Sequence, residues 1–137
     1  MILKLPEKPK PPSTKRIFAN PWAELDYLCK KISHWLYVEG HKARAGHYRN
    51  RLERVLDKLP ENELAILREE GLALLCELKG EKNAAIKHRK REIQLMERLH
   101  REAQAPKYTD STRAYMLHDR DTNVLDERRA ILDGLMK

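Results

Sequence analysis

The chain contains little glycine, phenylalanine or cysteine. Its 137 residues include five glycines, one phenylalanine and two cysteines. So few glycines do not fit the many turns of a β-sandwich. The longest unbroken apolar run, residues 72–76, is far shorter than the roughly 20 residues that cross a bilayer. We therefore expect a helical protein without a transmembrane segment or a membrane partner. Met1 is followed within five residues by proline and lysine, so we also expect no secretory signal.

Motifs that carry chemistry are also scarce. The glycines stand singly, so the chain has no glycine-rich phosphate loop. The three serines, Ser13, Ser33 and Ser111, do not stand in a nucleophile elbow. Cys29 and Cys76 alone cannot form a zinc site, and we interpret them as buried, reduced thiols of a cytoplasmic protein. We expect no catalytic residue, no cofactor, no metal and no small-molecule substrate.

The densest group of catalytic residue types is the segment His118-Asp119-Arg120-Asp121. A metal-dependent phosphohydrolase would need further histidines and an aspartate on other helices. The spacing of the other histidines does not suggest such a site: His34, His41, His47, His88 and His100. We therefore interpret Asp119 and Asp121 as caps of the last helix, where acidic side chains suit the helix dipole.

The abundant feature is charge, with an excess of positive charge. Charged residues make up 36% of the chain, against about 25% in an average domain. Lysine and arginine number 28 and aspartate and glutamate 21, giving a net charge of +7. This balance favours acidic partners, RNA or DNA above all.

Residues 1–20 differ in composition from the rest and are expected to form an extended, basic arm. Four prolines within positions 6–12 exclude a helix and favour a polyproline conformation. The arm also carries apolar residues that are unusual in a solvated tail: Ile2, Leu3, Leu5, Ile17 and Phe18. We expect the arm either to cover Tyr27 and Tyr37, two aromatic residues off the apolar line of the first helix, or to bind a partner subunit.

Apolar residues then recur every three or four positions, which is typical of amphipathic helices. This spacing predicts helices over 22–39, 41–59, 61–79 and 81–103. The first two helices are followed by Gly40 and Pro60, and the third by Gly80. The segment 106–137 is expected to contain a linker, a short helix around 112–117 and a last amphipathic helix.

An internal repeat becomes visible when the chain is shifted by the 40 residues that separate Gly40 from Gly80. Trp35 then falls on Leu75, Ala45 on Ala85, and Arg49 on Arg89. A period between 20 and 50 residues is typical of helical solenoids. The predicted fold is therefore all-α: two antiparallel hairpins within residues 21–105, closed by a capping helix within 106–137.

The second unit, with Leu72-Ala73, Gly80, Ala85-Ile86 and Leu95, resembles a tetratricopeptide hairpin. The resemblance covers about 34 of the 137 residues. The first unit departs from the family pattern, because Gly46 replaces an apolar residue and Pro60 comes late. The resemblance implies a protein-binding scaffold and implies no catalysis.

The second helix of each predicted hairpin carries a row of basic residues on the side away from its apolar face. One row is His47, Arg51, Arg54 and Lys58; the other is Lys87, Lys90, Arg91, Arg98 and Arg101. Such rows either keep a helix soluble or contact phosphates, and both interpretations stay open. In a hairpin solenoid the two rows would lie on a common surface.

Arg89 lies inside the apolar arc of its helix, and Glu92 follows one turn later. Either Arg89 extends its aliphatic part along the hairpin interface, or it contacts a buried ligand or a partner. An ion pair with Glu92 is also compatible with the spacing.

These observations favour a non-catalytic adaptor subunit that binds a protein partner in a larger assembly. Two hairpins are fewer than the roughly three repeats that usually fold independently, so the last helix or a partner must close the core. The alternative is an RNA- or DNA-binding protein that uses the basic rows, and both activities can coexist in a ribonucleoprotein.

Overall fold

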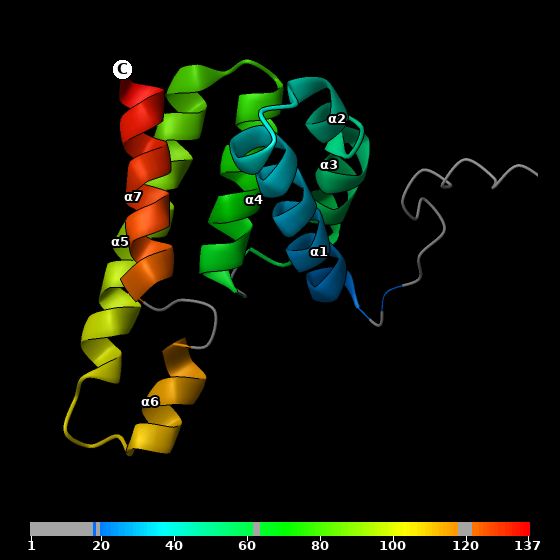
Figure 1. The fold of residues 1–137 in the computed structure, drawn as a ribbon. Coiled ribbons are helices and arrows are strands. Elements are labelled where there is room, and N and C mark those ends of the chain that lie inside the picture. The colour runs from blue at the N-terminus through cyan, green and yellow to red at the C-terminus, as the bar shows by residue number, and fades with distance from the viewer. Residues whose placement is uncertain (1–17, 19, 62–63, 118–121) are drawn as a thin grey trace, which may run out of the picture.

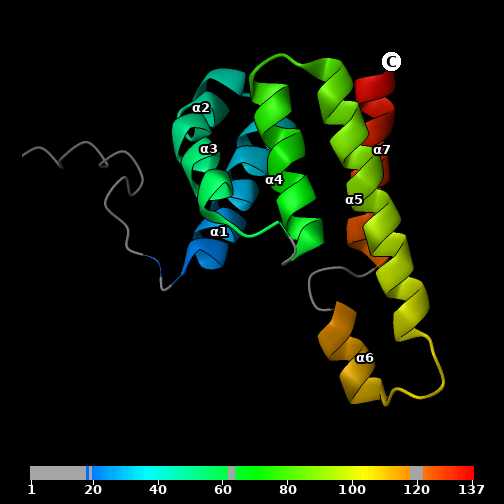
Figure 2. The same ribbon diagram turned by 180° about the vertical axis from the view of Figure 1, so that it is seen from behind.

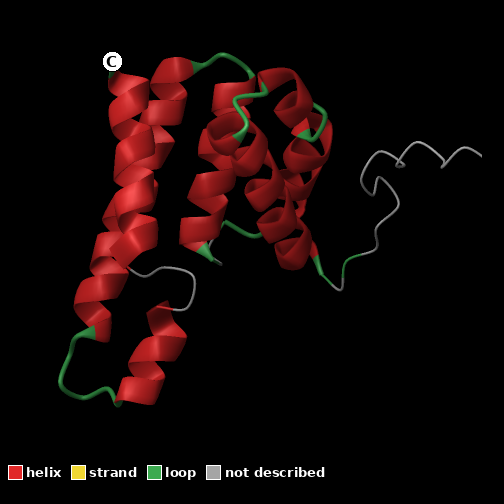
Figure 3. Cartoon of the chain, viewed as in Figure 1, coloured by secondary structure: helices red, strands yellow, loops and turns green. Residues whose placement is uncertain are grey.

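The computed structural model of the chain describes residues 18, 20–61, 64–117 and 122–137. Figure 3 shows these residues as helices joined by turns, with no strand among them. The all-α prediction is therefore confirmed for the described part of the chain. No helix found there is long and apolar enough to cross a membrane.

The helices are named in chain order. They are α1 (Pro21–Ser33), η1 (His34–Val38, a π-helical turn), α2 (Lys42–Gly46), α3 (Arg49–Lys58), α4 (Ala65–Leu78), α5 (Lys82–Ala103), α6 (Asp110–Leu117) and α7 (Thr122–Met136). Helix α1 begins as its sequence suggests: the Asn20 side chain accepts a hydrogen bond of 2.8 Å from the backbone N–H of Ala23, and Pro21 occupies the first helical position.

Helix α4 is the central element of the fold. It contacts α1 and α3 as well as α5, and α7 packs along α5 (Figures 1 and 2). Its apolar residues are buried or half-buried except Ala65, which is the one exposed residue of α4. A helix surrounded in this way must be apolar on most sides.

Among the described residues, the buried apolar side chains other than three alanines form two groups. The larger one joins α1, α3 and α4, with Leu25, Leu28, Leu52 and Leu74 fully buried. The smaller one joins Ile93 and Met96 of α5 to Leu125 of α7. Helix α7 thus covers the face of α5 that the first group leaves open.

Helix α6 lies at the far end of α5, where Arg113 donates a hydrogen bond of 2.7 Å from its Nε to the carbonyl of Ala103. The short helix expected around 112–117 begins two residues earlier, at Asp110. The segment 118–121, and with it the predicted caps Asp119 and Asp121, lies outside the described residues.

The single helix predicted over 41–59 is wrong. It is two helices, α2 and α3, separated by a turn at His47 and Tyr48. The N–H groups of these residues bond to the carbonyls of Arg44 and Ala45, three positions back, instead of four. Gly46, just before the break, is a poor helix former because it gains no side-chain contacts and loses much backbone freedom.

The helix predicted from residue 61 begins only at Ala65. Leu64 caps it with a left-handed backbone (φ 43°), which is unusual for a residue with a side chain. This strained residue directly precedes the first turn of α4, and residues 62–63 lie outside the described part.

Gly40 and Gly80 both adopt positive φ, 65° and 77°, as expected of glycines that end helices. The turns themselves differ. The N–H of Glu81 bonds to the carbonyl of Cys76, five residues back, whereas the N–H of His41 reaches the carbonyl of Trp35, six residues back. The hydrogen-bonded loop at Gly40 is one residue longer because the helix before it ends in the π-helical segment η1.

The offset of 40 therefore does not hold along the whole repeat. Ala45 and Ala85 are both fully buried, as predicted, but Trp35 is only half-buried where Leu75 is buried. Arg49 is exposed where Arg89 is buried. In the first helix of each unit the buried positions instead match at an offset of 42: Leu25, Leu28, Cys29 and Ile32 against Leu67, Glu70, Gly71 and Leu74.

Gly71 marks the closest approach of α4 to its neighbours. A Cβ atom at this position would lie 2.9 Å from Cδ1 of Leu25 and 3.2 Å from Cδ2 of Leu56, and both leucines are themselves buried. Gly46 is the matched control, since a Cβ there meets nothing within 4 Å.

We predict that Gly71→Ala lowers the free energy of unfolding by about 1–2 kcal/mol, because overpacking outweighs the better helix propensity of alanine. Gly46→Ala should raise it by up to about 1 kcal/mol. Urea unfolding followed by circular dichroism measures both. A stabilised Gly71→Ala variant would contradict the close packing of α1, α3 and α4.

Candidate functional site

The basic row on α5 is exposed to solvent along its whole length. All five predicted residues of this row are exposed: Lys87, Lys90, Arg91, Arg98 and Arg101. We call this set the α5 row. Within the described residues, none of its members has a carboxylate within ion-pair distance, whereas cations on other helices do, such as Lys30 with Asp26 at 3.0 Å. The α5 row is therefore a line of uncompensated positive charge.

The row on α3 is interrupted. His47, Arg54 and Lys58 are exposed, but Arg51 is not free: its Nη2 lies 3.5 Å from Oε1 of Glu24. Helix α4 lies between α3 and α5 in Figure 2 and packs against both. The two rows thus do not form the common surface expected from the repeat, because Arg51 faces α1 and α4 separates the remaining charges.

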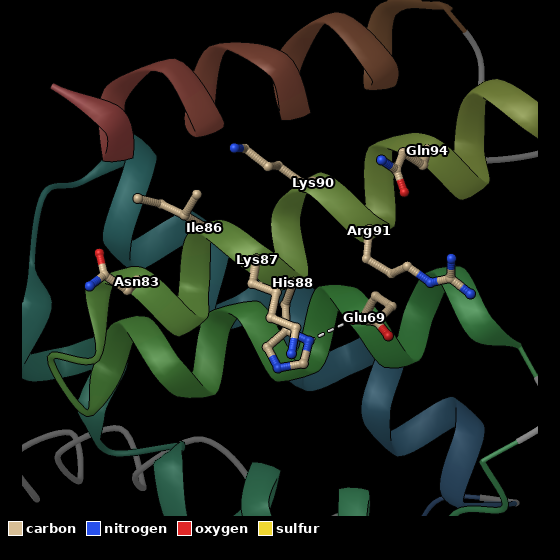
Figure 4. Close-up of a pocket in the computed structure, with 8 residues that line it drawn as sticks. All are labelled: Glu69, Asn83, Ile86, Lys87, His88, Lys90, Arg91 and Gln94. Atoms are coloured by element: carbon tan, nitrogen blue, oxygen red, sulfur yellow. Dashed lines mark hydrogen bonds and ion pairs between the residues drawn. The ribbon is translucent and has the colours of Figure 1, made fainter.

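An open pocket of ≈ 690 Å³ lies beside the first half of α5. Its lining, drawn in Figure 4, is Glu69, Asn83, Ile86, Lys87, His88, Lys90, Arg91 and Gln94. Glu69 is the one carboxylate of the lining, and its Oε2 is 2.7 Å from Nδ1 of His88. The remaining charged residues of the pocket are cations, which suits an anionic group.

The aromatic residues Tyr27 and Tyr37 do not form a shared aromatic surface, because each contacts other residues. The ring of Phe18 lies 5.1 Å from that of Tyr27, and the guanidinium of Arg51 is 5.7 Å from the Phe18 ring. Phe18 and Asn20, the N-cap of α1, are the parts of the predicted arm that the structure describes. Ile2, Leu3, Leu5 and Ile17 lie outside the described residues.

Tyr37 instead belongs to a polar network. Its hydroxyl donates to the carboxylate of Glu77 at 2.9 and 3.0 Å and accepts from Nη2 of Arg89 at 3.1 Å. Burial raises the pKa of Tyr37 well above its ordinary value. The phenol therefore keeps the proton that it donates to Glu77.

Arg89 is the centre of this network. It is 1% exposed, and its Nη1 donates to Oε1 of the fully buried Glu92 at 2.8 Å. Burial by itself lowers the pKa of Arg89, but the carboxylate of Glu92 and the neighbouring Tyr37 and Glu70 outweigh it and raise the pKa. The ion pair that the spacing allowed is present. The interpretation in which Arg89 extends along the hairpin interface to place its charge in solvent is wrong, because the guanidinium is buried.

Arg128 of α7 extends the network to a third helix. Its Nε donates to Oε2 of Glu92 at 3.2 Å, and its Nη2 donates to Oε1 of Glu70 at 2.9 Å. Glu70 and Glu92 come from α4 and α5 and are both buried. We call Glu70, Arg89, Glu92 and Arg128 the charge cluster. It joins α4, α5 and α7 by hydrogen-bonded ion pairs, which buried charges require.

The sequence held signals for this cluster. Glu70 lies three residues after Leu67 and four before Leu74, at an apolar position of its helix. Arg128 falls on the apolar line of the last helix between Leu125 and Leu132. A charged residue on an apolar face needs a partner of opposite charge, but its spacing alone cannot name a partner on another helix.

The two cysteines differ in exposure. Cys29 is buried, as expected, and burial raises the pKa of its thiol, with Glu70 adding to the shift. Cys76 is only half-buried, and burial raises the pKa of its thiol as well. Within the described part of the chain, no group of three or more histidine, cysteine, aspartate or glutamate residues is placed to hold a metal ion.

Comparison of the chain with protein-family models, with curated proteins and with solved structures gave no match.

We predict that Arg128→Met lowers the free energy of unfolding by about 3–5 kcal/mol, because it removes the cation that bonds the buried carboxylates of both Glu70 and Glu92. Arg129→Met is the matched control. Its side chain is 47% exposed and pairs with Asp126 at 3.3 Å on the surface, so the loss should stay below about 1 kcal/mol. Urea unfolding provides the measurement.

A double variant, Arg128→Met with Glu70→Gln, removes both charges and should recover part of the lost stability. Equal losses for Arg128→Met and Arg129→Met would contradict a stabilising role of the charge cluster.

Proposed function

We propose that the chain is a non-catalytic adaptor subunit that binds a protein partner through its helical surface and its N-terminal arm. The observation that carries the proposal is the π-helical turn η1. The exposed large apolar side chains of the described residues are Tyr37, Val38, Leu64 and Met136. Two of these four, Tyr37 and Val38, are neighbours on η1: Val38 is 72% exposed, and Tyr37 is 37% exposed although its hydroxyl is bonded to Glu77 and Arg89.

The surroundings of η1 support a contact with protein. Trp35, also on this turn, is half-buried, and the guanidinium of Arg44 lies 4.7 Å from its ring. Tryptophan, tyrosine and arginine are enriched among the residues that dominate protein interfaces. π-Helical turns also occur frequently at functional sites.

The start of the arm supports the same proposal. Phe18 packs on Tyr27 of α1, and Arg51 of α3 lies over the Phe18 ring. These contacts fix where the arm joins the helices. In the proposal, the repeat of two helical hairpins, α1 with α3 and α4 with α5, is the scaffold that presents both η1 and the arm.

We predict that Val38→Asp removes the partner without unfolding the protein, because the replaced side chain is exposed. Leu64→Asp is the control: it places the same charge at another exposed apolar residue, 56% exposed, at the start of α4. Purification of the native complex from the cells that produce the protein, followed by mass spectrometry, measures the partner. Retention of the same partner by both variants would exclude η1 as the contact.

Removal of residues 1–15 tests the arm in the same purification. The shortened chain should keep its helix content by circular dichroism and retain less partner. A full yield of partner would show that the arm takes no part in the interface.

The α5 row favours a second candidate function, the binding of RNA or DNA. Five exposed cations without a described carboxylate partner provide a site for phosphates. Such binding releases counterions, so its affinity falls steeply as salt is added.

We predict that the combined reversal of Lys87, Arg91 and Arg98 to glutamate weakens nucleic-acid binding and lowers its salt dependence. Each lost phosphate contact reduces the slope of log K against log salt by about 0.9 on duplex DNA. The control, Arg54→Glu with Lys58→Glu, changes exposed cations on α3. An equal effect of both variants would mean that only net charge matters.

A further inference from the structure

We infer that α5 binds in the major groove of duplex DNA, with its basic residues on the phosphates of both strands and Gln94 facing the base edges. The inference rests on the nucleic-acid function proposed above and specifies its ligand and geometry.

Up to Arg101, the exposed face of α5 contains only two kinds of side chain; the exposed Glu102 beyond it accepts a hydrogen bond from Tyr108 and pairs with Lys107 at 3.4 Å. Between positions 83 and 101, every exposed residue is an amide or a cation: Asn83, Lys87, Lys90, Arg91, Gln94, Arg98 and Arg101. Glu97 is half-buried, and its Oε1 lies 3.9 Å from Nη2 of Arg129. This face therefore offers hydrogen-bonding groups and positive charge and no free acid.

The order of these side chains around the helix is specific. At about 100° per residue, Gln94 lies opposite the buried Ala85. Lys90 and Arg101 fall on one flank of Gln94, and Arg91 and Arg98 on the other. Figure 4 shows the divergence directly: Lys90 points toward α7 and Arg91 toward α4.

This arrangement matches the major groove. The groove of B-form DNA is about 12 Å wide, admits an α-helix and has a phosphate strand on each side. Cations on both flanks can each reach one strand. The amide between them then faces the base edges, where glutamine can pair with adenine through its N7 and N6. The stretch from Lys87 to Arg101 spans about 21 Å at 1.5 Å per residue.

The pocket beside α5 provides a place for a phosphate on the α4 side. Lys87, His88 and Arg91 line it, and the carboxylate of Glu69 is bonded to Nδ1 of His88. The cations can therefore meet the phosphate without competition from a free carboxylate in the lining. Because this pocket lies on the α4 side of α5, we expect stronger contacts to the DNA strand on that side.

Other nucleic acids fit this face less well. Duplex RNA has a deep, narrow major groove that side chains cannot read. Single-stranded nucleic acid is bound through aromatic side chains on which bases stack, and the exposed residues of α5 between positions 83 and 101 include no aromatic residue.

The test is fluorescence anisotropy with the full chain and four probes of one mixed sequence. They are a 20-base-pair DNA duplex, the RNA duplex, the DNA single strand, and a DNA duplex with glucosylated 5-hydroxymethylcytosine, whose sugars fill the major groove. We expect the plain DNA duplex to bind at least tenfold more tightly than the other three. Equal affinity for the plain and the glucosylated duplex would overturn the placement in the major groove.

Variants assign the contact to α5. Lys90→Gln with Arg91→Gln should weaken binding to the DNA duplex at least tenfold and lower its salt slope by about two units. The control, Arg54→Gln with Lys58→Gln, should change neither value by as much. If the control has the same effect, α5 is not the contact.

The outcome also separates this inference from the function on which it rests. Tight, salt-dependent binding to the RNA duplex or the single strand would overturn the inference and leave nucleic-acid binding in place. Absence of binding to all four probes at 50 mM salt would overturn both.

Discussion

The buried charge cluster of Glu70, Arg89, Glu92 and Arg128 is the constraint on which the arrangement of α4, α5 and α7 depends. Each of these helices contributes at least one charge that must be paired. Ion pairs have directional hydrogen bonds, so they fix the rotation of a helix more strictly than apolar contacts do. Because Arg89 and Glu92 must point inward, the opposite face of α5 must point outward. The buried ion pairs of α5 thus determine that the α5 row is exposed.

The sequence predicts the features that depend on local spacing. Apolar periodicity locates most helices, the positive φ of Gly40 and Gly80 follows from their position after apolar helices, and the outward direction of the α5 row follows from the buried Ala85. Features that depend on distant parts of the chain are not accessible in this way. Arg128 and Glu70 are 58 residues apart, and no local pattern pairs them.

The repeat shows where local reasoning misleads. Two glycines at equal spacing suggested a uniform offset, but the π-helical turn η1 and the break after Gly46 change the register between them. Ile32 lies eight residues before Gly40, whereas Leu74 lies six before Gly80, although both are fully buried. In η1 the backbone departs from regular α-helical geometry, and Tyr37 and Val38 on this segment are exposed. The irregular element thus presents two of the four exposed large apolar side chains of the described residues.

The separation of the charge cluster along the chain has a consequence for synthesis. The residues of the apolar core that α1, α3 and α4 share all lie before residue 79. Glu70 and Glu92, in contrast, have no way to bond Arg128 until α7 has emerged from the ribosome. Until then Glu92 can pair with Arg89 of its own helix, but the cation of Arg128 is missing from the charge cluster, and the apolar face of α5 that receives Leu125 stays open. Helix α7 therefore completes both the charge cluster and the smaller apolar group.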